Sequence, residues 1–170
     1  MKDKINTITS FVSTFFTTIV VSIAAILVVC QAMDIQLFSV ESNSMAPLYP
    51  VDSLVFVKKA SPENIQENDV ISFVFNEDGM IVTHRVVAIN EEKQTFKTKG
   101  DNNDVEDPSP VLFGNVIGKV MFGIPKAGAV VRVFAAEENR KYIIAAILVL
   151  LVVNCFAGQK KKTPKDNNAC

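Results

Sequence analysis

Hydrophobic residues are distributed very unevenly along the 170-residue chain. Residues 5–33 contain no charged residue and have an apolar centre, and residues 142–158 form a second uncharged run. A helix needs about 20 apolar residues to cross a bilayer, so the first run is long enough and the second is near the short end of the range. We therefore expect two transmembrane helices, separated by a segment of about 105 residues that suffices for one domain.

Between these runs the pattern changes to short alternating stretches, which are typical of β-strands. Turn-forming sequences separate the stretches, namely NEDG at 76–79, NEEK at 90–93 and DNNDVEDPSP at 101–110. We expect a short helix within residues 125–142. The sequence thus predicts a mainly β fold, with a small antiparallel β domain flanked by the two transmembrane helices. The expected strands are 36–40, 53–59, 69–75, 80–89, 95–99 and 116–123.

The pattern divides the chain into four parts. Residues 1–34 form a cytoplasmic stub and a transmembrane anchor, 35–140 the β domain, 141–158 the second transmembrane helix and 159–170 a basic tail. The apolar part of the first run is longer than the 7–15 residues usual in a cleavable signal peptide, which favours a retained anchor.

The orientation of the chain follows from the lysines beside the two runs, because positively charged flanks remain on the cytoplasmic side. Lys2 and Lys4 precede the first run, and the tail contributes Lys160, Lys161, Lys162 and Lys165. We therefore expect a multi-pass protein of the cell membrane, with the lipid bilayer as a partner and the β domain on the outer face.

The composition excludes several kinds of site. With 17 basic and 18 acidic residues, the chain offers no charge excess for a nucleic acid partner. The β domain contains no cysteine, which excludes a cysteine nucleophile there, and one histidine cannot supply the usual zinc ligands. Residues 99–107 are rich in oxygen acceptors, but Leu112 stands where a calcium loop needs a bidentate glutamate. We expect neither a metal nor another cofactor.

Three short stretches of the β domain carry the polar residues of interest. They are ESNSMAPLYP at 41–50, VTHRV at 82–86 and KGDNNDVED at 99–107. Taken alone, the first is typical of a loop, the second of a structural histidine on a strand, and the third of a solvated turn.

In this order, the three stretches resemble the motifs of type I signal peptidases. The resemblance is to the endoplasmic-reticulum-type branch (family S26B), which includes archaeal enzymes and the SipW-like enzymes of Gram-positive bacteria. Ser44 in SNSMAP resembles the serine box, THRV the box in which this branch carries histidine in place of lysine, and KGDNN with Asp107 the final box. Asn43 and Ala46 depart from the usual residues, but neither departure removes a functional group. The resemblance covers roughly residues 36–125.

The resemblance implies a membrane-bound serine endopeptidase, signal peptidase I. Its substrates would be secretory preproteins with small residues at the first and third positions before the cut. It leaves open whether accessory subunits take part.

The residue types fit this chemistry. A serine hydroxyl is a poor nucleophile unless a base takes its proton, and His84 is the only histidine available to serve Ser44. A carboxylate on the other ring nitrogen would fix the tautomer; Asp101 and Asp107 are the candidates, and the family's second aspartate corresponds to Asp107. Ser42 is a candidate donor to the oxyanion, beside the Ser44 backbone N–H.

Two alternatives stay open at this stage. The chain could be a Ser–Lys peptidase that uses Lys58 or Lys59 as its base. It could also be a membrane-anchored β domain that binds or assembles exported proteins without cutting them.

Overall fold

The computed structural model describes residues 2–76 and 78–136, together with residues 144, 145, 147, 149 and 152. Most of the second apolar run and the whole basic tail lie outside the described residues. The second transmembrane helix and the predicted four-part division therefore stay predictions. The chain separates into two compact units, one formed by Val29–Phe134 and the other containing the residues up to Val28, and each is described by itself.

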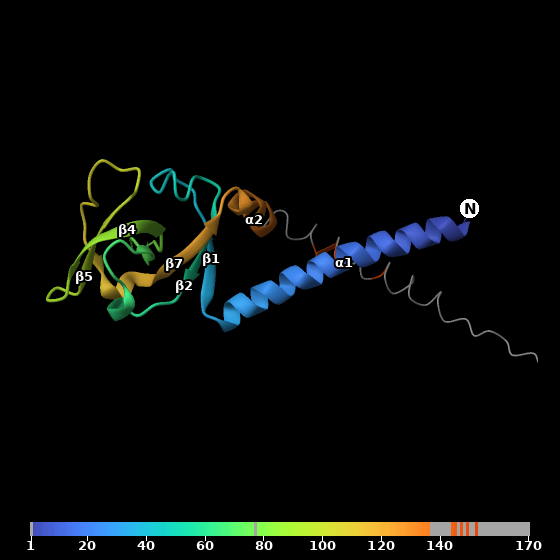
Figure 1. Cartoon of the computed structure of the whole chain (residues 1–170), viewed down its shortest axis with the longest axis horizontal. Coiled ribbons are helices and arrows are strands. Elements are labelled where there is room, and N and C mark those ends of the chain that lie inside the picture. Colours follow the sequence, from blue (N-terminus) through green and yellow to red (C-terminus); the bar gives the residue numbers. More distant parts are fainter. Residues whose placement is uncertain are drawn as a thin grey trace, which may run out of the picture. The chain divides into compact units, whose positions relative to one another are not determined.

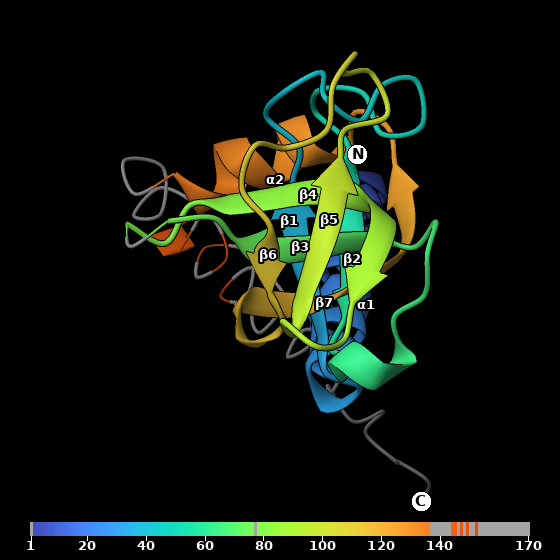
Figure 2. The ribbon, with the colours of Figure 1, turned by 90° about the vertical axis from the view of Figure 1, so that its left-hand side faces the viewer.

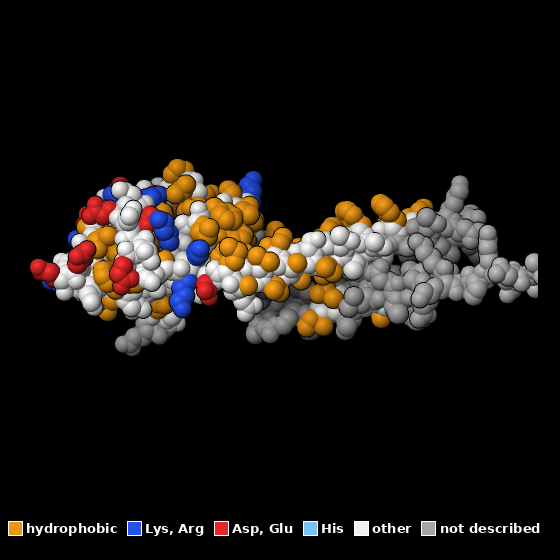
Figure 3. Space-filling view, turned by 60° about the horizontal axis from the view of Figure 1, so that its bottom comes forward, with side chains coloured by type: hydrophobic (Ala, Val, Ile, Leu, Met, Phe, Trp, Pro, Cys, Tyr) orange, Lys and Arg blue, Asp and Glu red, His pale blue; other side chains and the backbone are white. Residues whose placement is uncertain are grey.

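The helix α1 (Lys2–Ala32) begins the chain. Within it, Phe11–Ala32 is long and apolar enough to cross a membrane, and in the described part of the chain no other helix meets this criterion. Its large side chains are exposed, as Phe11 is at 74%, and Figure 3 shows hydrophobic side chains distributed along the helix. The Thr17 hydroxyl donates a hydrogen bond to the Ser13 carbonyl, which satisfies a polar group within this apolar segment.

Seven strands form one antiparallel sheet in the order β1-β2-β7-β3-β4-β5-β6 (Figures 1 and 2). Short 3-10 turns, η1 (Pro62–Asn64) and η2 (Phe113–Asn115), lie within the connections, and α2 (Ala127–Ala135) follows the last strand. The strands are β1 (Ile35–Ser39), β2 (Leu54–Lys58), β3 (Val70–Val74), β4 (Ile81–Asn90), β5 (Thr95–Lys99), β6 (Val111–Leu112) and β7 (Val116–Ile124).

The strand β4 connects the two parts of the sheet. Its residues up to Arg85 pair with β3, and its residues from Arg85 onward pair with β5. The register shifts between Val86 and Ala88, and such bulges bend and twist a strand. The sheet therefore curls. Its edge strands are β1 and β6, and the first residues of β4 also have a partner strand on one side only.

Two hydrophobic clusters fill the sheet unit. The first lies beneath β3, β4 and β5 and consists of Ile65, Ile71, Phe73, Val86, Phe96 and Val111. The second lies beside β2 and β7 and consists of Met45, Val55, Val57, Val70 and Val120. The second cluster includes a residue of the 40–53 loop, so the core reaches directly under the predicted serine motif.

The start of α2 packs closely against the loop that precedes β2. The Gly128 N–H donates a hydrogen bond to the Asp52 carbonyl at 2.8 Å, and Arg132 forms an ion pair with the Asp52 carboxylate. A Cβ on Gly128 would lie 2.6 Å from the Ser39 Oγ and from the Ser53 carbonyl oxygen. A glycine is therefore needed at this contact.

The predicted mainly β, antiparallel fold is confirmed. All six expected strands are present, and each begins and ends within two residues of its predicted bounds. The short helix expected within residues 125–142 is α2. The sequence pattern missed β6, which has only two residues and therefore no alternation to detect.

The first prediction concerns the core. Phe96→Ala should lower the free energy of unfolding by about 3–5 kcal/mol, because this fully buried ring would leave a cavity. Phe75→Ala is the matched control: this ring is 49% exposed, and its loss should cost about 0.5 kcal/mol or less. Urea denaturation of the full chain in detergent micelles, followed by circular dichroism, measures both values. Equal losses would contradict the assignment of Phe96 to the core.

Candidate active site

Ser44 lies on the loop between β1 and β2 and is partly exposed. The next residue, Met45, is 1% exposed and packs into the second hydrophobic cluster. The Tyr49 N–H donates to the Met45 carbonyl at 2.8 Å, which closes a turn around the buried side chain. Burial of Met45 thus fixes the backbone that carries the Ser44 hydroxyl.

A second segment holds the Ser44 backbone from the other side. The Asn102 N–H donates a hydrogen bond to the Ser44 carbonyl at 2.8 Å. A Cβ on Gly100 would lie 2.7 Å from the same carbonyl oxygen, closer than real Cβ contacts allow. The GDN motif at 100–102 therefore supports the serine loop through backbone contacts, and a glycine is required at its first position.

His84 lies on β4, where its neighbour across the ladder is Ile71 of β3. The residue is 8% exposed, and its ring lies edge-on to the ring of Phe73 at a centroid distance of 6.4 Å. Its Nδ1 is 2.6 Å from the Oδ2 of Asp107. The strand and this hydrogen bond together fix the orientation of the imidazole.

Asp107 is in turn held by Thr98 of β5. The Thr98 hydroxyl donates to the Asp107 Oδ2 at 2.7 Å, and the Asp107 N–H donates to the Thr98 carbonyl at 2.9 Å. Thr98 is fully buried, so its hydroxyl has no competing water. No motif of the sequence points to Thr98, although its place on the buried face of the predicted strand 95–99 is a usable signal.

Asp101 bonds Arg85 rather than His84. The Arg85 Nε and Nη2 donate to the two oxygens of Asp101 at 2.7 and 2.6 Å, and its Nη1 donates to the Asn68 carbonyl at 2.7 Å. The hydrogen bonds to Asp101 raise the pKa of Arg85, so the arginine stays charged. Arg85 was also missed from the sequence, although it follows His84 directly and points to the other face of β4.

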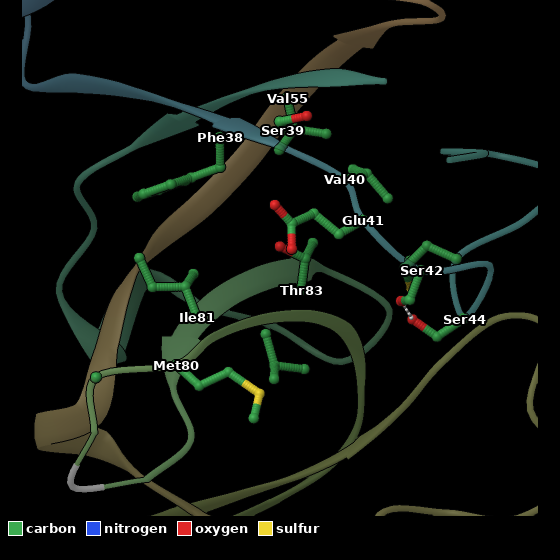
Figure 4. Close-up of a pocket in the computed structure, with 13 residues that line it drawn as sticks. Phe38, Ser39, Val40, Glu41, Ser42, Ser44, Val55, Met80, Ile81 and Thr83 are labelled. Carbon is green, nitrogen blue, oxygen red and sulfur yellow. Dashed lines mark hydrogen bonds between the residues drawn. The ribbon is translucent and has the colours of Figure 1, made fainter. Parts of the chain in front are cut away.

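The Ser42 and Ser44 hydroxyl oxygens lie 3.0 Å apart, and either can be the donor (Figure 4). No hydrogen bond between Ser44 and His84 occurs among the contacts of the described residues. Catalytic hydrogen bonds are often long before substrate binds, so their absence does not exclude a candidate base. The structure thus joins His84 with Asp107, Asp101 with Arg85, and Ser42 with Ser44.

A pocket of about 650 Å³ extends from Ser44 between the open edge of β1 and the open edge at the start of β4. One wall is the segment 38–42 at the end of β1, and the other is the segment 79–83 at the start of β4 (Figure 4). Met45 and Val55 also contribute to the lining. An extended chain placed in the pocket would therefore have an unpaired strand edge on each side.

The two lysines considered as alternative bases are both exposed. Lys58 pairs with Ile35 and Lys119. Leu54, at the other end of β2, pairs with Ser39, and the loop that carries Ser44 begins at this end. At about 3.3 Å per residue, Lys58 is roughly 13 Å along the strand from that end. This position disfavours a Ser–Lys pair.

Among the described residues, no group of three or more histidine, cysteine, aspartate or glutamate side chains could hold a metal ion. The absence of a cofactor stays a prediction from the sequence.

Comparison with known proteins identifies the relatives of this chain. The family profile described as "Signal peptidase, peptidase S26" matches residues 9–102, more than half of the chain. Signal peptidase I W of Bacillus subtilis (strain 168) is 42% identical over 81 residues, which cover 46% of this chain and 42% of that protein. Signal peptidase complex catalytic subunit SEC11C of Homo sapiens is 26% identical over 132 residues, which cover 72% of this chain and 69% of that protein.

The match to the Bacillus protein therefore spans less than half of that protein's length. The range matched by the family profile contains Ser44, His84 and Asp101, whereas Asp107 lies beyond it. A bacterial signal peptidase and catalytic subunits of eukaryotic signal peptidase complexes both occur among the relatives, in agreement with the branch predicted from the motifs. The chain belongs to the signal peptidase family, peptidase S26.

Proposed function

We propose that this chain is a membrane-bound serine endopeptidase that removes N-terminal signal peptides from secreted preproteins. Ser44 is the nucleophile, His84 the general base and Asp107 the residue that orients the base. The observation that carries the proposal is the 2.6 Å contact between His84 Nδ1 and Asp107 Oδ2 on a buried strand. The family of the chain and the names of its relatives support the reaction class.

The first chemical step is attack on the scissile carbonyl. The Ser44 Oγ forms a bond to the carbonyl carbon while His84 Nε2 takes its proton, because Nδ1 is occupied by Asp107. The negative Asp107 stabilises the imidazolium that results. The Ser44 N–H and the Ser42 hydroxyl, which lies 3.0 Å from the Ser44 hydroxyl, donate to the developing oxyanion.

The second step releases the products. The amide C–N bond breaks and the leaving amine takes the proton from His84, which leaves the signal peptide as an ester on Ser44. A water molecule then gives its proton to His84 and its oxygen to the ester carbon. Collapse of this intermediate returns the proton to Ser44 and frees the signal peptide.

The substrate binds as an extended strand in the pocket beside Ser44. On the pocket side, β1 and the first residues of β4 have no partner strand, so main-chain hydrogen bonds there can hold a peptide of almost any sequence. Val40 and Met80 do not take part, because their backbone groups are bonded within the sheet unit. Small side chains at the first and third positions before the cut bond are the substrate class that the motifs imply.

The position of the enzyme follows from its apolar segments. In this proposal Phe11–Ala32 anchors the chain in the bilayer, and Lys2 and Lys4 stay on the cytoplasmic side. The sheet unit then faces outward, where exported preproteins emerge. The predicted second helix would return the basic tail to the cytoplasmic side and make the protein multi-pass.

The proposal predicts the behaviour of the nucleophile and the base. Ser44→Ala and His84→Ala should fold normally but fail to cleave a radiolabelled preprotein in proteoliposomes. The wild-type kcat/KM should fall as the pH is lowered, because a protonated imidazole cannot accept the Ser44 proton. Ser44→Ala that still cleaves would overturn the proposal, and a wild-type chain that binds preproteins without cutting them would favour a binding protein.

Loss of Asp107 should mainly affect the rate of cleavage, whereas loss of Asp101 should mainly affect stability. Asp107→Asn should fold normally and lose about 10⁴-fold in kcat, because the amide no longer holds the imidazole in the required tautomer. Asp101→Asn removes half of a bidentate ion pair with Arg85 and should lower the free energy of unfolding by about 1–2 kcal/mol, with a smaller effect on rate. Preprotein cleavage and urea denaturation separate these effects. A folded, inactive Asp101→Asn beside an active Asp107→Asn would reverse the assignment.

A further prediction concerns the support of the serine loop. Gly100→Ala would place a methyl group 2.7 Å from the Ser44 carbonyl oxygen, so the loop must move. Because a displacement of about 1 Å at a catalytic group can cost about 100-fold in rate, we expect a loss of this order in kcat/KM. Gly114→Ala, where no atom lies within 4 Å of the added carbon, is the control and should keep full activity. Equal activity of the two variants would contradict the proposed support.

A further inference from the structure

The pocket beside Ser44 has an unbalanced charge. Its apolar side chains come from both walls, and all of its polar side chains end in oxygen. None of the lining residues carries a basic group. The polar lining residues are Ser39, Glu41, Ser42, Ser44 and Thr83.

Glu41 supplies the one formal charge among these lining residues. It is exposed, and its side chain extends from the β1 wall into the pocket, toward Thr83 and away from the Ser42–Ser44 end (Figure 4). Within the described part of the chain, its carboxylate makes no hydrogen bond or ion pair. The arginines of the sheet unit are already engaged, Arg85 with Asp101 and Arg132 with Asp52.

The Thr83 hydroxyl on the far wall adds an acceptor but no positive charge. It shares a hydrogen bond of 2.7 Å with the Oγ of the buried Ser72, in which either oxygen can donate, and a hydroxyl oxygen has two acceptor lone pairs. An ammonium group offers three donors and a full positive charge. A basic side chain therefore complements this part of the pocket better than a neutral or acidic side chain.

We propose that Glu41 is a specificity-determining residue, which makes the enzyme prefer preproteins with a lysine or arginine at the second or fourth position before the cut bond. The inference rests on the proposed function, because it takes the pocket to be the substrate groove. Glu41 lies only three residues before Ser44, where β1 leads into the bent serine loop. A substrate strand in the pocket therefore passes Glu41 a few residues before the cut bond, and the second and fourth positions are those that the motifs leave free to carry a long side chain.

The test compares preproteins that differ at one position. Two series carry Lys, Gln or Glu at the second or at the fourth position, with alanine at the first and third, and the full-length chain cleaves them in proteoliposomes. In at least one series, kcat/KM should follow the order Lys, Gln, Glu, with about a three- to fivefold difference between Lys and Gln, as for an exposed ion pair. High salt should reduce the difference, because it screens exposed charges.

Variants at position 41 identify the group responsible. Glu41→Gln should give nearly equal kcat/KM values for Lys and Glu substrates, and Glu41→Lys should reverse the order. Glu92→Gln, an exposed glutamate in the turn between β4 and β5, is the matched control and should keep the wild-type preference.

The outcomes separate the inference from the function on which it rests. If the wild-type enzyme cleaves the Gln substrates but treats Lys and Glu alike in both series, the inference about Glu41 is wrong and the proposed function stands. The inference is equally wrong if Glu41→Gln keeps the full preference for Lys. If none of the substrates is cleaved, the proposed function falls and the inference falls with it.

Discussion

Two neighbouring residues of β4 bind two aspartates of one loop, and the geometry of the whole candidate site depends on this double link. His84 bonds Asp107 on one face of the strand, and Arg85 bonds Asp101 on the other. Since successive strand residues point to opposite faces, the loop is held from both sides. The same loop supplies the Asn102 N–H that holds the Ser44 carbonyl. Moving the serine relative to the histidine therefore requires the loss of either the Asn102–Ser44 hydrogen bond or the contacts that hold the loop to β4.

The fold was predictable wherever a strand is long enough to alternate. The stretch 80–89, for example, corresponds to β4, and its bounds differ by one residue at each end. The strand order was not predictable, because β7 inserts between β2 and β3 although it comes last in the sequence. Local patterns contain no information about such distant pairings. The predicted second membrane helix is not tested by the described residues.

The motifs predicted which polar residues lie near one another. They did not predict the neighbouring side chains that hold these residues in place. His84 and Asp107 were expected to pair, and they lie in contact, but their catalytic roles stay part of the proposal. The support from Thr98 and Arg85 was not expected. Neither belongs to an obvious chemical pattern, and each becomes important only when the sheet register brings a distant aspartate to it. Contacts of this kind depend on tertiary structure and cannot be derived from spacing.

The curl of the sheet bears on how one enzyme of this kind could bind many substrates of different sequence. The end of β1 and the start of β4 face each other across the pocket, and neither has a partner strand on that side. A guest strand would complete the sheet through amide groups that are common to all polypeptides. Main-chain hydrogen bonds would then supply most of the binding energy. The volume of the side chains and the few charges near the groove would determine which peptides bind. Diverse leaders could share one binding mode without sharing a sequence.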